Sequence, residues 1–259
     1  MSKIAISILN WNGLELTTRC VQGLLDQAVP ADIYILDNGS AQNEADKLRE
    51  RFGDAVQIER SVHNLGFSGG NNYWIERLVN QYDSILLLNQ DTVITSDIVT
   101  PLAQALDQDA RAAAVGPTGA KISLWTGKVV RDQGSDCVVG YCILLSSSAL
   151  KQVGWLEDQY FAYYEEADWC MRARKAGWHC VVVPLAGIAH EQNHRFRTNY
   201  IARNMVWFMK RFASPAQLIF FFGYYFTVFW IERLRKGSSP HDLVHAAQAG
   251  WFHRLPKLY

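Results

Sequence analysis

The amino-acid sequence predicts an α/β protein built on a mostly parallel, Rossmann-like sheet with helices on both faces. Short apolar runs alternate with segments of helical periodicity through the N-terminal part of the chain, which is the order of consecutive βαβ units. The run from Ile85 to Leu88 is apolar without alternation, as in a strand that is buried on both faces. Several runs end abruptly in amides and carboxylates, and in open α/β sheets ligands bind beyond such strand ends.

Composition indicates a globular protein of one large or two small domains. The 259 residues are 49% hydrophobic and 19% charged, which is enough to bury a full core. The five cysteines are odd in number and lack C-x-x-C spacing, which argues against a disulfide framework and against a zinc ribbon. Strand-like sequence begins at Ile4 and leaves no room for a signal peptide. We therefore expect a protein of the cytoplasm, or of the cytoplasmic face of a membrane.

The formal net charge is zero, but the charges are distributed unevenly. Residues 1–189 carry 15 Lys and Arg against 22 Asp and Glu, whereas residues 190–259 carry 10 against 3. A basic C-terminal quarter suggests an anionic partner, either phospholipid headgroups or a phosphorylated substrate. No motif supports binding of nucleic acid, and we expect none.

The elements are expected in a regular order. Strands are predicted at residues 4–9, 33–36 and 56–59 and at the run ending at Leu88. Helices are predicted at residues 14–27 and 43–52, in a segment ending near Gln81, and from about Asp97 with Ser96 as its N-cap. Beyond Pro117 the pattern changes to a surface hairpin at 118–134, a buried strand at 137–145, a short serine-capped helix to Val153 and a last strand at 180–183. We therefore divide the chain into a domain of residues 1–211, with halves 1–116 and 117–211, and a C-terminal segment of residues 212–259.

Three polar stretches lie where strands end. Residues 89–91, Asn-Gln-Asp, lie where a metal ion or a phosphate would meet the sheet, although a plain polar turn is the alternative. Residues 37–40, Asp-Asn-Gly-Ser, are either a ligand loop or only a turn, because Asn and Gly tolerate positive φ. Residues 63–72 form a loop rich in Gly and Asn before a helix, which suits close approach of a nucleotide or tight packing equally well. That loop matches neither G-x-G-x-x-G nor a P-loop.

A second dense cluster lies between residues 160 and 172, where Glu165, Glu166 and Asp168 stand among aromatic residues. Aromatic surroundings desolvate acids and raise their pKa values, as a general base requires. If Glu166 opens a helix, Glu165 and Asp168 share one face near its N-terminus and Glu166 points elsewhere. The simpler interpretation is that acids favour the first turn of any helix.

A histidine, His190, follows the last predicted strand. A lone histidine is more often structural than a ligand. Asp91, the acid cluster and His190 all lie at ends of strands or helices, however. Their convergence would form an Asp/His metal site beside a general base.

Together these motifs resemble the family 2 glycosyltransferases of the GT-A fold, especially a bacterial rhamnosyltransferase-like branch. The resemblance runs from about Ile4 to Arg211 and keeps the family's order of motifs. Residues 8–13 are similar to the family's opening strand and loop, residues 36–40 to its aspartate loop that holds the nucleoside, and residues 64–72 to its nucleotide-contacting loop. Residues 88–91 are similar to its D-x-D or N-P-D motif, and residues 161–172 to its aromatic-acidic acceptor motif. His190 resembles its metal-associated histidine, and Arg203-Asn204 resembles its downstream pair.

The resemblance implies a role for each matching residue. Glu166 would be the catalytic base. The acceptor would be bound by Glu165, Asp168 and Trp169. A divalent cation, Mg²⁺ or Mn²⁺, would be held by Asp91 and His190. The nucleotide sugar would be bound by Asn10, Asn12, Asp37, Asn64, Gly66, Gly69, Asn71, Asn89, Gln90, Asp91 and Arg203. After closure of a mobile loop, Arg195 and Arg197 would join Arg203 at the phosphates.

Two departures from the family pattern matter. Gln90 replaces the usual proline or acid, which leaves Asp91 as the only carboxylate at that motif and suggests a weaker or water-rich metal site. Glu166 stands where the family commonly has aspartate. Its extra methylene moves the carboxylate by about one bond length, so the acceptor must bind slightly further away.

The implied reaction is inverting transfer of a sugar, with rhamnose favoured, from a dTDP- or UDP-sugar to a hydroxyl of a glycan or lipid-linked glycan in cell-surface polysaccharide synthesis. Two other classes stay open. A sugar nucleotidyltransferase should show Arg and Lys in a glycine-rich loop after the first strand, and residues 10–13 contain no basic residue. A non-catalytic carbohydrate-binding domain of the same fold would not need an acid at position 166.

The C-terminal segment contains an apolar and aromatic run at residues 218–231 between basic residues. As a helix the run would be about 21 Å long, too short for the roughly 30 Å hydrocarbon core. It could pack on the sheet or in a dimer interface. We favour an interfacial helix that holds the protein peripherally on the cytoplasmic face of the inner membrane, because aromatic and cationic residues settle at headgroup depth.

Overall fold

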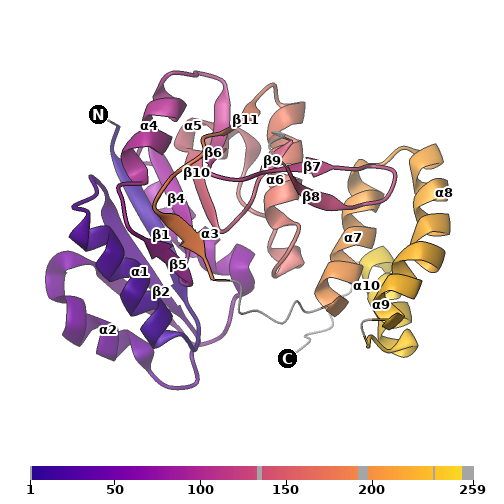
Figure 1. Ribbon diagram of the computed structural model, residues 1–259, viewed down its shortest axis with the longest axis horizontal. Coiled ribbons are helices and arrows are strands. Elements are labelled where there is room, and N and C mark those ends of the chain that lie inside the picture. The colour runs from indigo at the N-terminus through magenta and orange to yellow at the C-terminus, as the bar shows by residue number, and fades with distance from the viewer. Residues whose placement is uncertain (1, 133–135, 192–197, 236, 253–259) are drawn as a thin grey trace.

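A computed structural model describes residues 2–132, 136–191, 198–235 and 237–252 of the chain. Its central element is a seven-stranded sheet with the strand order β11-β6-β10-β4-β1-β2-β3 (Figure 1). Neighbouring strands are parallel except β10, which runs antiparallel to both β4 and β6. The predicted α/β class with a mostly parallel sheet is confirmed.

The elements of this central layer follow the order expected from the sequence, except for β6, which the sequence analysis did not predict. The strands are β1 (Ile4–Asn10), β2 (Asp32–Asn38), β3 (Gln57–Ser61), β4 (Ser84–Asn89), β6 (Ala112–Gly116), β10 (Cys142–Ser146) and β11 (His179–Val182). The helices around them are α1 (Leu14–Asp26), α2 (Glu44–Phe52), α3 (Gly66–Leu78), α4 (Val99–Asp107), α5 (Ser147–Val153) and α6 (Glu165–Lys175), with 3-10 turns at Gly53–Ala55 and Asp158–Tyr160.

Strand β4 is buried on both faces, as its unbroken apolar sequence predicts. Ile85 and Leu87 belong to the core that also contains side chains of α3, α5 and α6. Leu86 and Leu88 belong to the core on the other face, with side chains of α1, α2 and α4. Each face of the sheet is therefore covered by its own layer of helices (Figure 1).

The strand register gathers the polar strand ends at one edge of the sheet. Asn10 at the end of β1 lies beside Asp37 of β2. On the other side of β1, Leu9 lies beside Asn89 of β4. The carboxyl ends of β1, β2 and β4 therefore meet at the edge where the sequence predicts the ligand site.

The structure differs from the sequence prediction at three places. Residues 137–145 form two strands, β9 (Cys137–Val138) and β10, because a turn that contains Gly140 separates them. Helix α3 begins at Gly66, so most of the expected glycine-rich loop is the first part of a helix. Asp97 rather than Ser96 caps α4, accepting bonds from two backbone N–H groups at 2.8 and 3.1 Å. The Ser96 hydroxyl instead donates to the carbonyl of residue 186.

Two small sheets complete the domain. Strand β5 (Thr92–Ile94) pairs antiparallel with β12 (Ile188–His190), which places His190 opposite Thr92. Strands β7 (Gly119–Ile122) and β8 (Val129–Asp132) form the predicted surface hairpin, with β9 on the other side of β7. The hairpin reaches toward the C-terminal helices (Figure 1).

The described part of the chain from Thr198 onward is helical, as predicted for the segment after residue 211. Its elements are α7 (Thr198–Phe212), α8 (Pro215–Tyr224), a π-helical turn η3 (Tyr225–Phe229), α9 (Trp230–Arg235) and α10 (Pro240–Phe252). They gather at one end of the molecule, beyond the β7–β8 hairpin (Figure 1). Phe221, Tyr225 and Phe229 are at most 1% exposed and belong to the same core as α7. Within the described ranges, none of the helices is both long enough and apolar enough to cross a membrane.

Candidate active site

Asp91 and His190 lie together at the carboxyl edge of the sheet. The pairing of β5 with β12 brings His190 Nε2 to 3.1 Å from Asp91 Oδ1. Asn89 Nδ2 lies 3.4 Å from the same ring nitrogen. The ring of Tyr141 stacks on the imidazole, with 4.7 Å between ring centroids and 9° between the planes. Strand pairing on one side and stacking on the other thus keep the imidazole facing the carboxylate.

This donor pair fits a divalent cation that is shared with a diphosphate. The two side chains are nearly buried, Asp91 at 1% and His190 at 13% exposure. His190 Nδ1 is buried without a hydrogen-bond partner among the described residues, whereas Nε2 faces Asp91 and is the ring nitrogen that could serve as a ligand. The described chain contains no group of three or more His, Cys, Asp or Glu that could hold a metal. Diphosphate oxygens and water would therefore supply the other ligands, as is usual for Mg²⁺.

Gln90 binds the protein itself. Its Oε1 accepts hydrogen bonds from the backbone N–H of Trp11 at 2.9 Å and from the Thr17 hydroxyl at 3.2 Å. A Cβ atom at Gly13 would meet Gln90 Nε2 at 2.5 Å, so this close approach requires glycine. Gln90 therefore closes the loop after β1 against the end of β4. Its contact with the donor stays a prediction.

A buried polar network joins the ends of β1 and β2. The fully buried Asp37 carboxylate accepts a bond from the backbone N–H of Ser40 at 3.2 Å and lies 3.4 Å from Arg60 Nε. Asn10, also fully buried, donates to Glu44 Oε2 at 2.8 Å. Both side chains therefore shape the edge of the sheet from within. Sequence reasoning missed Glu44, whose only signal was its place in the first turn of the helix after the loop.

Asn12 has a different setting from Asn10. It is exposed, has a positive φ of 47°, and its side chain accepts a bond from the backbone N–H of Ala41 at 2.8 Å. Asn12 and its neighbour Trp11 are thus the exposed residues of this loop, and Asn12 also bonds to the loop after β2. Its binding of the nucleotide sugar stays a prediction.

Asn38 attaches the start of α3 to β2, although the sequence analysis did not select it. Its Oδ1 accepts a bond from the backbone N–H of Leu65 at 2.9 Å, and its Nδ2 donates to the Gly66 carbonyl at 3.0 Å and to Asn64 Oδ1 at 3.3 Å. Gly66 has φ +74°, and a Cβ there would lie 2.4 Å from the carbonyl oxygen of Phe161. The close approach at Gly66 therefore lets the segment before the acid cluster lie against α3, while Asn64 bonds to Asn38; donor contacts of Asn64 and Gly66 stay predictions.

The other two selected residues of this stretch lie within α3. Asn71 is 1% exposed, accepts a bond from the Ser7 hydroxyl at 3.1 Å and donates to the Phe67 carbonyl at 3.0 Å. Gly69 is partly exposed, and a Cβ there would meet Leu65 Cβ at 3.2 Å. Asn71 thus ties α3 to β1, and donor contacts of either residue stay predictions.

Helix α6 begins after a segment with unusual backbone conformation. Phe161, Tyr163 and Tyr164 have positive φ values of 64°, 71° and 76°, each at a cost on the order of 1–3 kcal/mol. Asn204 of α7 compensates, because its Nδ2 donates to the carbonyls of residues 160, 162 and 163 at 3.1, 2.8 and 2.7 Å. The backbone that precedes the acids is therefore fixed by a helix far along the chain.

Arg203 supports the same segment. It is 2% exposed, and its Nη2 donates to the carbonyls of residues 159 and 160 at 2.8 and 2.6 Å. Burial lowers the pKa of Arg203 to about 10. The contact of Arg203 with the nucleotide sugar stays a prediction. In the structure its side chain bonds to the carbonyls of residues 159 and 160. Arg195 and Arg197 lie outside the described residues.

Glu165 and Glu166 form an acid pair in the first turn of α6. The helix begins at Glu165, one residue earlier than expected. Glu165 is 4% exposed and Glu166 is partly buried. Burial and the charge of Glu166 raise the pKa of Glu165 well above its usual value, and burial also raises the pKa of Glu166. Glu166 thus has the raised pKa that suits a general base.

Asp168 and Trp169 lie inside the protein. The Asp168 carboxylate is fully buried, 2.7 Å from Arg172 Nε and 3.0 Å from Arg211 Nε. Trp169 is fully buried, and its Nε1 donates to the Gly154 carbonyl at 2.8 Å. Any effect of these two residues on the acceptor would act through the position of α6. Their roles in acceptor binding stay predictions.

The turn between β9 and β10 connects the two predicted centres. Tyr141 stacks on His190. Its neighbour Gly140 faces the acid pair, because a Cβ at this glycine would lie 3.6 Å from Glu166 Cδ. One peptide unit therefore separates the residue at the imidazole from the residue at the acid. Sequence analysis missed both, and the available signal was a glycine inside an apolar run.

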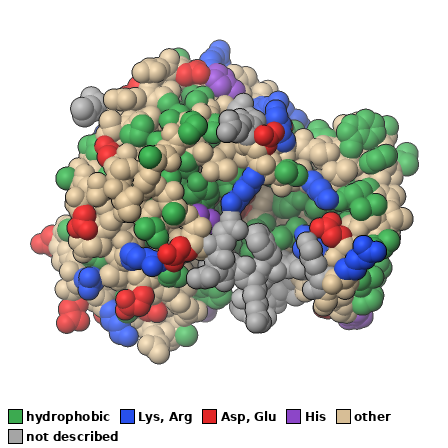
Figure 2. Space-filling model, viewed as in Figure 1, with side chains coloured by type: hydrophobic (Ala, Val, Ile, Leu, Met, Phe, Trp, Pro, Cys, Tyr) green, Lys and Arg blue, Asp and Glu red, His purple; other side chains and the backbone are tan. Residues whose placement is uncertain are grey.

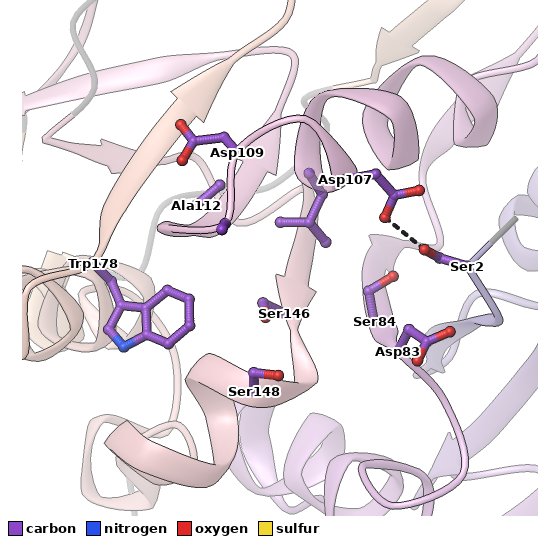
Figure 3. A pocket seen from close by; sticks show the side chains of 11 residues that line it. Ser2, Asp83, Ser84, Asp107, Asp109, Ala112, Ser146, Ser148 and Trp178 are labelled. Carbon is purple, nitrogen blue, oxygen red and sulfur yellow. Dashed lines mark hydrogen bonds between the residues drawn. The ribbon is translucent and has the colours of Figure 1, made fainter.

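A polar cavity of about 180 Å³ lies away from this site (Figure 3). It is lined among others by Ser84 at the start of β4, by Asp107 at the end of α4 and by Asp109 beyond it. Two of its carboxylates have partners, since Ser2 Oγ donates to Asp107 at 2.5 Å and Asp109 lies 2.6 Å from His179 Nε2. The lining contains none of the predicted site residues.

The sheet topology places the protein in the GT-A class of α/β folds. The chain belongs to glycosyl transferase family 2, whose family model matches residues 5–154. The predicted family is therefore confirmed. The predicted domain boundaries at residues 116, 211 and 212 stay predictions.

Two named relatives are similar to the chain at low identity. The low-salt glycan biosynthesis hexosyltransferase Agl10 of Haloferax volcanii is 25% identical over 197 residues, which cover 66% of this chain and 63% of that protein. The N-acetylglucosaminyl-diphospho-decaprenol L-rhamnosyltransferase of Mycobacterium tuberculosis is 25% identical over 214 residues, which cover 64% of this chain and 68% of that protein. The chain thus spans less than two thirds of the length of the first relative.

Solved structures share the fold. A mannosyltransferase from Pyrobaculum calidifontis, in complex with GDP-Man and Mn²⁺, superposes with a TM-score of 0.64 at 10% identity and covers 98% of this chain and 88% of that one. GalNAc-T7 with UDP, GalNAc and Mn²⁺ gives a TM-score of 0.68 at 11% identity, covering 81% and 48%. At these identities the likeness concerns the fold alone.

Proposed function

We propose that this protein is an inverting, cation-dependent glycosyltransferase that moves a sugar from a nucleotide diphosphate donor to a hydroxyl of a glycan or lipid-linked glycan. The observation that carries the proposal is the turn at Gly140 and Tyr141, with Glu166 on one side and His190 on the other. In-line displacement needs a base for the entering hydroxyl and charge compensation for the leaving diphosphate. The two sides of this turn offer those two functions.

The donor would bind along the carboxyl edge of β1, β2 and β4. Asp91 and His190 would hold Mg²⁺ or Mn²⁺, which when bound neutralises charge that develops on the departing diphosphate. The loops after β1 and β2, with Asn12 at the surface, would enclose the nucleoside. The predicted donor contacts of Asn64, Gly66, Gly69 and Asn71 would lie at the start of α3, whose first backbone N–H groups already bond to Asn64 and Phe161.

Glu166 would act on the acceptor. As the acceptor oxygen attacks the anomeric carbon, the bond from that carbon to the diphosphate oxygen breaks and the hydroxyl proton passes to the Glu166 carboxylate. Attack from the side opposite to the leaving group inverts the anomeric configuration. The backbone held by Arg203 and Asn204 would keep α6, and with it the base, in a fixed position.

The names of the relatives support the proposed substrates. The mycobacterial relative is a rhamnosyltransferase that acts on N-acetylglucosaminyl-diphospho-decaprenol, and the haloarchaeal relative is a hexosyltransferase of glycan biosynthesis. We therefore favour rhamnose as the sugar, a dTDP- or UDP-linked donor, and an acceptor of cell-surface polysaccharide synthesis. Neighbours with UDP or GDP-Man and Mn²⁺ support a nucleotide sugar and a divalent cation.

Two other functions are less well supported. A sugar nucleotidyltransferase would need basic residues after β1, where the chain has Asn10, Trp11, Asn12 and Gly13. A non-catalytic carbohydrate-binding domain would gain nothing from the acid pair, because buried carboxyl groups are costly to maintain without a function.

A membrane is the proposed site of action. We define the apolar face as the exposed side of α8, η3 and α9, whose side chains are 40–77% exposed: Ile219, Phe220, Phe226, Val228, Ile231 and Leu234. Hydrophobic side chains gather where α8 lies (Figure 2). Trp125 of the hairpin loop is 52% exposed and packs edge-on against Phe220, with 5.5 Å between ring centroids. Aromatic residues beside the exposed Arg235 suit the headgroup region on the cytoplasmic side of the inner membrane.

A ligand screen tests the proposal. The full-length protein is heated with dTDP-, UDP- and GDP-sugars, each with Mg²⁺, with Mn²⁺ and with chelator. We expect one class of nucleotide sugar to raise the melting temperature, and only with the cation. Slow hydrolysis of that donor without acceptor would separate an enzyme from a binding domain. Stabilisation by nucleoside triphosphate with a sugar phosphate would instead favour the nucleotidyltransferase.

A further inference from the structure

Glu165 is a buried titratable group that the proposed chemistry does not use. It is 4% exposed, and its Oε2 is buried without a hydrogen-bond partner among the described residues. Glu166 Oε2 is in the same situation. The two carboxyl groups are adjacent in the first turn of α6 and interact with each other. Two neighbouring buried carboxyl groups do not both ionise unless a cation lies between them.

Among the described residues, no Lys or Arg is one of the main influences on the pKa values of Glu165 and Glu166. The charge of Glu166 raises the pKa values of Cys137 in β9 and of Tyr164 before α6. Both of these groups are neutral near pH 7. Arg233 of α9 acts on Tyr164. After burial, the strongest influences on the pKa values of Glu165 and Glu166 are each other and backbone N–H groups, as far as the described chain shows.

The two acids differ in how well their anions are stabilised. Glu165 is 4% exposed whereas Glu166 is partly exposed, so the Glu165 carboxyl group is the more strongly desolvated of the two. Backbone N–H groups of Glu166 itself, Gly140 and Ala167 lower the pKa of Glu166 against the effect of burial. Gly140 lies beside this carboxyl group, since a Cβ at Gly140 would be in ordinary contact with Glu166 Cδ at 3.6 Å. A carboxylate that accepts several N–H bonds keeps its charge, so the single negative charge of the pair belongs on Glu166.

We propose that Glu165 retains a proton near pH 7 and donates it as a hydrogen bond to the Glu166 carboxylate, which makes Glu165 a positioning residue for the base. The inference rests on the proposed function, because it takes Glu166 as the base. The Glu165 proton stays in place during the reaction. The acceptor proton passes to Glu166, and the pair returns one proton to water after the product leaves.

Infrared difference spectroscopy tests the protonation state without any substrate. Spectra of the full-length protein near pH 7 are compared with those of Glu165→Gln and Glu166→Gln. We expect the C=O stretch of a protonated carboxyl group to be lost in Glu165→Gln and kept in Glu166→Gln, because burial alone keeps Glu165 neutral. Loss of the band in Glu166→Gln alone, or no change in either variant, would overturn the proposal. Since no turnover is needed, this result is independent of the proposed function.

Kinetics then test the positioning role. Glu165→Ala should lower turnover and move the acid limb of the kcat/KM profile upward by about one to two pH units, because Glu166 loses a hydrogen bond to its charged form. Glu165→Gln keeps a hydrogen-bond donor at the same place. Its turnover should be at least tenfold higher than that of Glu165→Ala, and its acid limb should lie close to that of the wild type. If Glu165→Gln is as impaired as Glu165→Ala, with a raised KM for the acceptor, Glu165 acts as an anion and the proposal is wrong. Absence of transfer by the wild-type protein would count against the proposed function and leave the infrared result standing.

Discussion

His190 Nε2 lies 3.1 Å from Asp91 Oδ1, although the two residues are 99 positions apart in the sequence. The antiparallel pairing of β12 with β5 brings them together, and the Tyr141 ring fixes the imidazole by stacking on it. A carboxylate and an imidazole at the edge of a parallel sheet form a pair that a divalent cation and a diphosphate can share. The first prediction follows from this contact.

Replacing Asp91 by Ala should remove the cation dependence of nucleotide binding together with most activity. The reason is that His190 alone cannot hold Mg²⁺ or Mn²⁺ against water. The measurement is the melting temperature with the preferred nucleoside diphosphate, with and without the cation, alongside the transfer rate. Asp109→Asn, at an exposed ion pair with His179, is the matched control. Full activity of the wild-type protein in excess chelator would refute a role for the metal.

Replacing Glu166 by Gln should lower turnover by roughly 10²-fold or more, as loss of a general base usually does. Folding and donor binding should persist, because the two side chains are nearly isosteric. Single-turnover rates and donor affinity are the quantities to measure. Near-normal turnover in Glu166→Gln, combined with inactivity of Asp168→Asn in a folded protein, would assign the base to another acid.

The rate should depend on pH through Glu166. Burial raises the pKa of this carboxyl group, and a base must be ionised to accept a proton. Activity is therefore expected to rise with pH, with the midpoint above the usual glutamate value of about 4.3. The kcat/KM profile, with donor binding measured at each pH as the control, reports this midpoint. A profile that stays flat through pH 4 would be inconsistent with Glu166 as the base.

Replacing Asn204 by Ala should lower both stability and turnover. The substitution leaves three carbonyls of residues 160–163 without their amide donor, at a cost of about 1–3 kcal/mol in the free energy of unfolding. The positive φ values of Tyr163 and Tyr164 would then be less well supported. Urea unfolding and the transfer rate measure the two effects, and the exposed Asn80→Ala is the control. Unchanged turnover at reduced stability would show that the backbone of residues 160–163 does not position Glu166.

Replacing both Phe220 and Phe226 by Glu should abolish binding to liposomes that contain anionic lipids. Both side chains are at least half exposed on the apolar face, and a charge there opposes insertion at headgroup depth. Co-sedimentation at low and high salt is the measurement. Val62→Glu places the same charge on a valine that is 85% exposed elsewhere. Equal binding by the double variant and the wild type would exclude the apolar face as the membrane-binding surface.

Point substitutions are a cleaner test of the apolar face than removal of the C-terminal segment. Phe221, Tyr225 and Phe229, on the other side of the same helical run, are buried in the core that includes α7. A chain ending near Arg211 would expose that core. Loss of lipid binding in such a chain could therefore reflect unfolding.

Some predictions depended only on local sequence. Strand β4 was predictable because four consecutive apolar residues, Ile85 to Leu88, can be satisfied only by burial on both faces. The hairpin at 118–134 and the cap of α5 were predictable from turn and capping chemistry, and Ser146 accepts the expected bond from the N–H of Ala149. The start of α3 was not, because whether Gly66 and its neighbours form loop or helix depends on contacts with Asn38 and Phe161.

The sequence by itself determined the α/β class and the family, since strand periodicity, strand-end polar residues and motif order are local properties of the chain. Only the tertiary structure decided which residues meet. It assigned Asp168 and Trp169 to the interior, because Arg172, Arg211 and the Gly154 carbonyl provide partners there. It also brought Gly140 to the acid and Tyr141 to the imidazole, because long-range strand pairing sets distances that neighbours along the chain cannot specify.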